Sequence, residues 1–413
     1  MRILCAVHNA YTDSTSGAAR SVRLALQWLR DGGHECRVLG TARFDAKPPA
    51  SLDAHLAELG VPLRHTPPSK AFVRSVKKPA NMIVGRPTVD FTFQGVPVTM
   101  LLTRTVLDAA AEGFELQQFL FLLDDILRQF QPDVLFTYGA HPVVQEAMRR
   151  AKRRGAVTVF YLLNHGYGDR RFFEHVDRTF ACSPYLADLY RTQIGLHCDV
   201  MEPPIDWAEA EAPADLRRFV TFVNPSAIKG AMLFARLADM LGAARPDIPL
   251  LVVQSAATAG GLNAIQGLDF KKYPHIMAAP ATPRPADFFA LTKILLVPST
   301  FPEPFGMVAA EAMINGIPPL VSDRGALPQT VRGAGRVVPL PDWLTEKSTE
   351  LPTVEETQPW FDAVCELWDD PDVYAKAAAE ARQAAECVYR ETVMRRRYLD
   401  YFESLDRPVR LFD

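Results

Sequence analysis

The sequence predicts an α/β protein made of two domains, each built on a parallel sheet. Short apolar runs alternate with amphipathic runs along almost all of the 413 residues, which is the pattern of strand–helix–strand units. A chain of this length usually contains two or three domains. Between residues 202 and 217 the composition becomes acidic and rich in alanine and proline, as in an interdomain linker. We therefore expect domains at 1–203 and 204–390, followed by a C-terminal helix at 391–413.

The first domain begins with an apolar run that predicts a strand and continues by alternation. Strands are expected at residues 3–7, 35–39, 134–137, 157–162 and 178–182, and helices at 17–31, 52–59, 101–130, 142–154 and 184–193. Alternating residues around Gln94-Gly95 predict a hairpin over 90–99, because this dipeptide suits a tight turn. The basic, irregular segment 67–87 is either a lid over an acceptor or an ordinary connection.

The second domain repeats the same alternation. Strands are expected at 219–224, 249–254, 275–278, 293–298, 319–321 and 336–339. Helices are expected at 285–291 and 306–315, and the tail from 360 to 405 is predicted to be helical.

Composition excludes several classes of partner. Apolar residues make up 48% and charged residues 23% of the chain, as in ordinary globular proteins. The net charge of −3 provides no field that would attract nucleic acid, so we expect no stable nucleic-acid binding. No apolar run reaches the length of about 18 residues that a membrane span needs. The first residues are too short for a signal peptide. We expect a cytoplasmic protein; peripheral contact with a membrane and the oligomeric state are left open.

Two basic runs, at residues 149–154 and 395–397, fall on predicted helices. A solvated helix face explains them best. The alternative is a docking surface for an anionic acceptor or a membrane.

A strand, a turn and a helix start follow one another between residues 293 and 315. The amides of Gly306, Met307 and Val308 would point out of the helix start, where an anion binds well. Gly306 has no side chain, so a phosphate can approach the backbone closely.

Two carboxylates flank this helix start and are separated by seven residues. Glu303 lies in the turn before the helix, and Glu311 lies about two turns into it. One carboxylate can meet one end of an extended ligand and the other carboxylate the opposite end, with phosphate between them. A nucleotide-sugar has this layout of sugar, diphosphate and ribose.

The run at 297–313, Val-Pro-Ser-Thr-Phe-Pro-Glu-Pro-Phe-Gly-Met-Val-Ala-Ala-Glu-Ala-Met, resembles the Glu-x7-Glu signature of glycosyltransferase family 4. The continuation to Gln329, which includes Gly-Ile-Pro and Ser-Asp-Arg-Gly-Ala-Leu-Pro, resembles the same family. The resemblance implies a GT-B fold: two Rossmann-like domains face each other across a cleft, and a C-terminal helix returns to the first domain. It also implies a hexosyltransferase-like enzyme that transfers a sugar, with retention, from a UDP- or GDP-sugar. The acceptor is then the hydroxyl of a glycan, a lipid-linked glycan or a small molecule.

The resemblance also implies roles for residues of the second domain. Glu311 would hold the ribose hydroxyls, and Glu303 would contact sugar hydroxyls. Lys229 would neutralise the diphosphate, since Lys229 and Gly230 match the family's Gly-Arg-x4-Lys-Gly segment. The arginine of that segment is absent, because Asn224 or Pro225 stands in its place.

The resemblance points less directly to two further donor contacts on the second domain. Arg324 is a candidate to replace the missing arginine, or it is a solvated loop residue. The loop at 278–283, which contains Pro280, would pack against the nucleobase through backbone groups.

On the first domain, the resemblance points to a loop and two histidines. Ser16 stands where the family has the first of two adjacent glycines, and Gly17 keeps the second, at a helix start that can meet the donor. His165 follows a strand and would stand at the reacting centre, and His141 follows another strand and would line the acceptor pocket. Helix capping or structural packing is the alternative for each.

The sequence shows no His or Cys spacing for a metal. We therefore expect no metal and no cofactor, the nucleotide-sugar being a substrate. Two other classes of protein stay open. One is a nucleotide-sugar epimerase or hydrolase on the same fold, and the other is a non-catalytic protein that binds a nucleotide-sugar.

Overall fold

The computed structural model describes residues 1–45, 49–76, 85–106, 113–255, 257–258 and 273–405. The chain forms two compact units. The first unit contains Met1–Cys182, Leu186–Pro204 and the chain from Arg395 onward, and the second contains Ser183–Tyr185 and Ile205–Met394.

The first unit is built on a nine-stranded sheet, counted over the described residues, in the order β3-β4-β5-β2-β1-β6-β7-β8-β9. From β5 to β9 neighbouring strands are parallel, and β3, β4 and β5 pair antiparallel. The strands are β1 Arg2–Ala6, β2 Glu35–Thr41, β3 Arg64–Thr66, β4 Thr88–Phe93, β5 Val96–Leu101, β6 Val134–Thr137, β7 Val157–Leu162, β8 Arg178–Ala181 and β9 Asp199–Val200.

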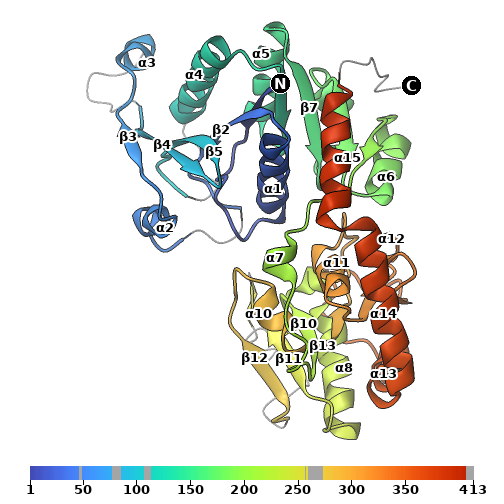
Figure 1. Cartoon of the computed structure of the whole chain (residues 1–413). Helices are drawn as coiled ribbons and strands as arrows, with labels where there is room; N and C mark the ends of the chain where they lie inside the picture. The colour runs from blue at the N-terminus through green and yellow to red at the C-terminus, as the bar shows by residue number, and fades with distance from the viewer. Residues whose placement is uncertain (46–48, 77–84, 107–112, 256, 259–272, 406–413) are drawn as a thin grey trace. The chain divides into compact units, whose positions relative to one another are not determined.

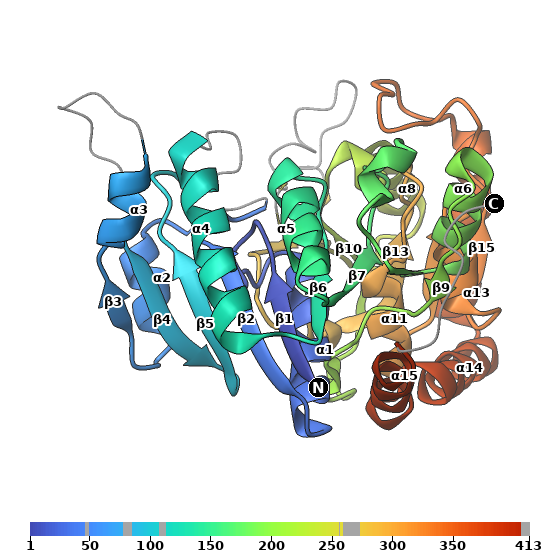
Figure 2. The ribbon, with the colours of Figure 1, turned by 90° about the horizontal axis from the view of Figure 1, so that it is seen from above.

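Helices pack against this sheet, and α4 and α5 lie side by side (Figures 1 and 2). The helices are α1 Gly17–Asp31, α2 Leu52–Glu58, α3 Lys70–Ser75, α4 Gly113–Phe130, α5 Pro142–Arg153, the 3-10 helix η2 Arg170–Phe173, α6 Pro184–Ile194 and α15 Glu391–Glu403. The last helix returns to this unit as predicted. The hydroxyl of Tyr398 lies 3.1 Å from that of Tyr161, and the Phe402 ring meets Phe136 edge-on.

The second unit is a six-stranded parallel sheet in the order β12-β11-β10-β13-β14-β15, again over the described residues. Its strands are β10 Phe219–Val223, β11 Leu250–Val253, β12 Ile276–Ala279, β13 Thr292–Val297, β14 Pro319–Ser322 and β15 Arg336–Val338. Its helices are α7 Trp207–Ala210, the 3-10 helix η3 Ala227–Lys229, α8 Ala231–Ala244, α10 Ala286–Phe289, α11 Met307–Ile314, α12 Leu327–Val331, α13 Val354–Asp369 and α14 Pro371–Val388.

The core of the second unit follows from the apolar strands. Phe222 of β10 and Leu296 of β13 are buried with Leu237 of α8 and Trp360 of α13. A strand covered on both faces must be apolar along its whole length, which is why these runs do not alternate.

Three predicted elements needed correction. The helix expected at 101–130 begins at Gly113 in the structure, because Leu101 belongs to β5 and pairs with Thr88 and Thr41; residues 107–112 of the expected helix lie outside the described residues. The helical tail is three helices, since Asp370 caps a new helix in which Pro371 is the first residue. The segment 202–217, which was predicted to be a linker, contains the short helix α7.

The hairpin prediction is confirmed. β4 and β5 pair around Gln94 and Gly95, whose φ angles of 49° and 78° are those of a tight hairpin turn. The short strands β3 and β9 and the helix α3 were not predicted. Residues 77–84 of the 67–87 connection lie outside the described residues.

Candidate active site

The predicted strand–turn–helix is formed by β13 and α11, and the buried carboxylate in its turn forms an ion pair. The Glu303 side chain is 9% exposed and lies with its Oε1 2.5 Å from Lys229 Nζ. The Ser299 hydroxyl donates to the same Oε1 at 2.8 Å. Lys229 belongs to η3, so the fold brings together two predicted site residues from distant segments. The contact of Ser299 was not predicted, although this residue belongs to the recognised run.

Lys229 is positioned because η3 is held against the β13–α11 turn. The amides of Thr300 and Phe301 donate to the Ile228 carbonyl at 3.1 and 3.2 Å. Gly230 follows η3 with a φ of 90°, and a Cβ there would lie 1.9 Å from the Pro298 carbonyl oxygen. Only glycine permits this approach.

The start of α11 has the properties of an anion site. Gly306 precedes the helix with a φ of 97°, and no side chain in the described part of the chain caps this end. The first N–H groups of a helix have no acceptor within it, and they attract negative charge. Gly306, Met307 and Val308 are half-buried.

The loop after β14 holds the turn that contains Glu303 in place through backbone contacts. Gly325 bridges to Glu303, and the Ala326 amide donates to the Glu303 carbonyl at 2.8 Å. A Cβ at Gly325 would lie 2.4 Å from that carbonyl oxygen. The Ser322 hydroxyl donates to the Ser299 carbonyl at 2.7 Å. The backbone of Glu303 therefore has a fixed place.

Glu311 is only 3% exposed, and every other side chain of α11 is apolar. The carboxylate is therefore buried on an otherwise apolar helix. Asn315 secures this part of the helix by donating to the Glu311 carbonyl at 2.9 Å and to the Ala210 carbonyl at 2.8 Å. Burying a carboxylate costs free energy unless polar groups meet it.

Arg324 extends toward the loop after β15. Its Nη2 lies 3.1 Å from the Pro341 carbonyl oxygen and 3.5 Å from that of Leu340, and its Nε lies 3.7 Å from Asp323. The guanidinium therefore anchors this loop in the structure.

Asn224 follows β10 in the left-handed conformation, with a φ of 61°. Its side-chain oxygen accepts from the Ala257 amide at 3.3 Å. Pro280 is exposed directly after β12.

On the first unit, Ser16 is the N-cap of α1. Its hydroxyl accepts from the Ala19 amide at 3.3 Å. Gly17 is the first residue of α1, and a Cβ there would meet no atom within 4 Å. The buried carboxylate of Asp13, which sequence reasoning missed, shapes the loop by accepting from the Thr15 and Ser16 amides at 2.8 and 3.3 Å.

His141 caps α5, since its Nδ1 accepts from the Val143 amide at 3.2 Å. Its ring is stacked on that of His8, with the centroids 3.6 Å apart and the planes 7° apart. His8 was not predicted, although it directly follows the first strand as His141 and His165 follow others.

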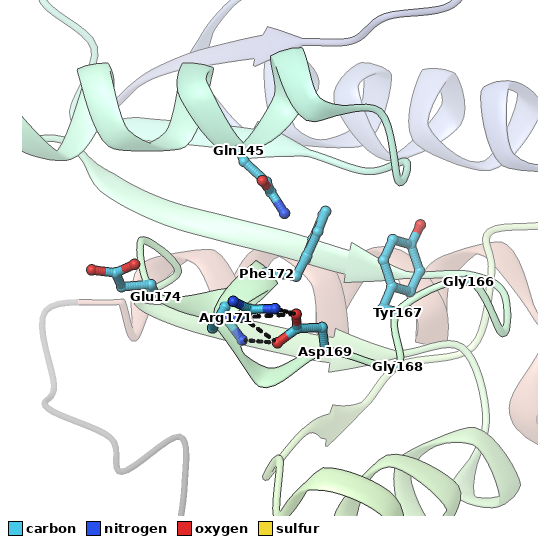
Figure 3. A pocket seen from close by; sticks show the side chains of 8 residues that line it. All are labelled: Gln145, Gly166, Tyr167, Gly168, Asp169, Arg171, Phe172 and Glu174. Carbon is cyan, nitrogen blue, oxygen red and sulfur yellow. Dashed lines mark hydrogen bonds and ion pairs between the residues drawn. The ribbon is translucent and has the colours of Figure 1, made fainter.

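His165 is half-buried in the loop after β7. Beside it lies a pocket of about 440 Å³, which was not predicted. Figure 3 shows its lining, which comes from α5, from the loop and from η2. The lining residues are Gln145, the glycines and tyrosine of 166–168, Asp169, Arg171, Phe172 and Glu174.

The basic runs are largely neutralised by acidic neighbours. Arg149 and Arg150 both bind Glu146, and Arg150 also binds Asp124 of α4. These hydrogen bonds, that of Arg149 first, lower the pKa of Glu146 to about 2. In the second run Arg397 binds Glu202 at 2.6 Å. A solvated, ion-paired helix face therefore fits these runs.

Among the described residues, no His, Cys, Asp and Glu side chains gather in a group of three or more that could hold a metal ion. Within the same residues, no helix is both long and apolar enough to cross a membrane.

Comparison with known proteins gives a family match over part of the second unit. The sequence model described as Glycosyl transferases group 1 matches residues 271–343, which include Glu303, Glu311 and Arg324. A search of curated proteins gives no match.

Several solved structures resemble the chain over nearly its whole length. Sucrose-phosphate synthase from Thermosynechococcus elongatus has 13% identity and a TM-score of 0.66, over 98% of this chain and 99% of that one. HepE from Anabaena, in complex with UDP and glucose, has 14% identity and a TM-score of 0.64, over 97% and 99%. The catalytic domain of starch synthase IV from Arabidopsis thaliana, bound to ADP and acarbose, has 11% identity and a TM-score of 0.63, over 97% and 99%. The chain therefore has the GT-B fold, with two parallel-sheet domains.

Proposed function

We propose that this protein is a retaining glycosyltransferase of family 4 type. It would transfer a sugar from a UDP- or GDP-sugar to an acceptor hydroxyl. The observation that carries the proposal is the joint placement of the buried Glu303 paired with Lys229, the uncapped start of α11 and the buried Glu311 on that same helix. The match to a glycosyltransferase family over this segment supports it, as do neighbours named with UDP and with ADP.

The second unit would hold the donor. The diphosphate is assigned to Lys229 and to the amides of Gly306, Met307 and Val308, which together supply positive charge where charge grows on the leaving group. Glu311 is assigned to the ribose hydroxyls, which would hydrogen-bond its buried carboxylate. Glu303 is assigned to the sugar hydroxyls.

Further donor contacts are proposed at the edges of this site. Pro280 would border the nucleobase, and Asn224 and Arg324 would lie toward the diphosphate. Ser16 and Gly17 of the first unit keep their proposed donor contact through the start of α1.

The reaction needs no nucleophile from the protein. The acceptor oxygen bonds to the anomeric carbon on the face from which the diphosphate leaves. The bond between that carbon and the phosphate oxygen breaks, and the hydroxyl proton passes to the leaving phosphate oxygen. His165 is assigned to the reacting centre and His141 to the acceptor side. The enzyme would act in the cytoplasm without metal or cofactor.

A panel of nucleotide-sugars tests the donor class. Binding to the native state raises the melting temperature, so UDP-, GDP- and ADP-sugars can be compared by thermal shift. We expect a UDP- or GDP-sugar to give the largest shift, and its incubation with acceptors to release the nucleoside diphosphate. Tight nucleotide binding without any turnover would favour a non-catalytic binding protein instead. Release of an epimerised or free sugar from the donor alone would favour an epimerase or hydrolase.

Glu311→Gln tests the ribose assignment. A hydrogen bond to a charged group contributes about 1.5–3 kcal/mol, whereas the neutral bond that Gln can keep contributes about 0.5–1.5 kcal/mol, so the nucleotide affinity should fall roughly tenfold. Calorimetry of nucleotide binding measures this change. Glu350→Gln, at an exposed residue, serves as the control and should bind like the wild type. An unaltered affinity in Glu311→Gln would show that the ribose lies elsewhere.

A further inference from the structure

The pocket beside His165 has the chemistry of a carbohydrate site, and we propose that it binds a neutral sugar residue of the acceptor. This inference rests on the proposed function, because it names the class of acceptor for that reaction. The pocket lies wholly within the first unit, and its volume of about 440 Å³ falls in the range of small-ligand sites.

Its polar groups suit hydroxyls. Asp169 and Arg171 form a bidentate pair, in which Arg171 Nε donates to Asp169 Oδ1 at 3.1 Å and Nη2 donates to Oδ2 at 2.6 Å. Gln145 extends from α5 toward Phe172 on the opposite side (Figure 3). A carboxylate accepts, a guanidinium donates and an amide does both. A ligand whose groups both donate and accept, such as a sugar, can therefore satisfy all three.

The charge of the lining argues for a neutral ligand. Asp169 and Glu174 are acidic, and Arg171 is the one basic residue among the lining residues. Arg171 already binds Asp169, and this hydrogen bond raises the pKa of the guanidinium further. An anionic group entering the pocket would meet an excess negative charge, whereas a hydroxyl would not.

The apolar side of the pocket is rigid. Phe172 is buried and packs against the rings of Tyr167 and Phe160, with centroids 4.9 and 5.2 Å away. The Tyr167 amide donates to the Tyr190 hydroxyl at 3.0 Å, which fixes the loop that carries His165. A preorganised apolar surface beside planar polar groups can hold the hydrocarbon face of a sugar ring with little loss of conformational freedom.

Gly168 offers a way to close the pocket without disturbing the fold. It lines the pocket, and a Cβ at this residue would meet no atom within 4 Å, with no left-handed backbone to oppose it. Gly168→Phe should therefore fill the pocket. Gly113, at the exposed start of α4, has the same freedom and lies outside the pocket, so Gly113→Phe is the matched control.

The test uses the full chain and the methyl glycosides of glucose, galactose, mannose and N-acetylglucosamine, with methyl glucuronoside as the anionic comparison. Binding is measured by titration calorimetry and by saturation-transfer NMR. We expect at least one neutral glycoside to bind to the wild type and to Gly113→Phe. Its affinity should fall at least about tenfold in Gly168→Phe and in Arg171→Ala, the latter being a change at an exposed side chain.

The proposal is overturned if no neutral glycoside binds, if Gly168→Phe and Arg171→Ala both bind it like the wild type, or if the anionic glycoside binds more tightly. Nucleotide binding is measured on the same variants. Unchanged nucleotide affinity with lost glycoside binding locates the effect in the pocket. If glycosides bind but no nucleotide-sugar does, the proposed function is contradicted, whereas the assignment of the pocket as a sugar-binding site stands.

Discussion

At the scale of single residues, the Glu303 carboxylate is the best-organised group of the candidate site. Lys229 and Ser299 donate to the same oxygen, and Gly325 and Ala326 hold the Glu303 backbone. Such a group keeps its position before a ligand arrives, so little reorganisation is needed when charge develops nearby. The pair would also be sensitive to loss of Lys229, because the buried Glu303 carboxylate would then lose its charged partner.

Lys229→Ala and Arg324→Ala should separate two roles. Lys229→Ala removes the proposed diphosphate contact and should lower both donor affinity and kcat, since leaving-group charge grows in the transition state. If Arg324 replaces the absent family arginine, Arg324→Ala lowers kcat/KM as well, and the double variant is non-additive because both side chains act on one ligand group.

The alternative for Arg324 is its observed contact with the 340–341 loop. In that case Arg324→Ala lowers the free energy of unfolding by about 1 kcal/mol and leaves kcat/KM unchanged. Donor kinetics and urea denaturation on the four proteins of the cycle decide between the two. A wild-type kcat/KM in Lys229→Ala would remove the diphosphate assignment itself.

At the scale of elements, glycines allow segments to approach each other closely. Gly230 and Gly33 share nearly the same φ, 90° and 91°, but only Gly230 faces a backbone atom at 1.9 Å. Gly33→Ala should cost about 1 kcal/mol, from the left-handed backbone alone. Gly230→Ala should cost at least about 3 kcal/mol, because η3 must also move away from Pro298.

Chemical denaturation measures both glycine variants. Equal losses of stability would show that the approach of η3 to β13 is looser than the structure indicates. The displacement should also reach Lys229 next to Gly230, so Gly230→Ala is expected to bind the donor more weakly than Gly33→Ala does.

The ion pairs of Glu146 with Arg149 and Arg150, all on α5, predict a pH-dependent stability. Glu146 has a lowered pKa of about 2, against an ordinary value of 4.5. Its ionised form therefore stabilises the fold above pH 4.5, and this contribution is lost as the pH falls toward 2. Because these side chains are partly exposed to solvent, which screens the pair, we expect Glu146→Gln to cost about 1 kcal/mol at pH 7. The difference from wild type in urea denaturation should shrink below pH 4.5, and a constant difference would contradict the assignment.

Most helices and strands could be predicted from the sequence because their apolar residues recur with a clear period. The prediction was wrong where pairing with distant strands determines the secondary structure. Leu101 could extend a helix by pattern, but pairing with Thr88 and Thr41 places it in β5. The three-residue strand β3 is exposed throughout and has no apolar period to detect. The boundary between α13 and α14 has a signal in the sequence, because Asp370 is a typical N-cap residue and Pro371 is typical of the first residue of a helix. Applying these two signals to the helical tail would have predicted the boundary.

At the scale of the whole molecule, the two-domain GT-B architecture was predictable from alternation, length and one motif. The site was only partly predictable. Glu303, Glu311 and Lys229 lie in runs with a recognisable order, whereas the pocket at 166–174 and the His8–His141 stack depend on neighbouring strands that end at one sheet edge. A local pattern does not contain such contacts, because they join residues far apart in the chain.

The proposed donor site predicts how the activity responds to chelators. The diphosphate is assigned to Lys229 and to the amides of the α11 start, which would provide the positive charge that a divalent ion supplies in other enzymes. These groups are covalently part of the chain, so EDTA cannot remove them. We expect kcat and the donor KM to stay within about twofold of their values without EDTA, measured by release of the nucleoside diphosphate. Turnover that disappears in EDTA and returns on adding Mg²⁺ or Mn²⁺ would show that a metal ion shares this charge.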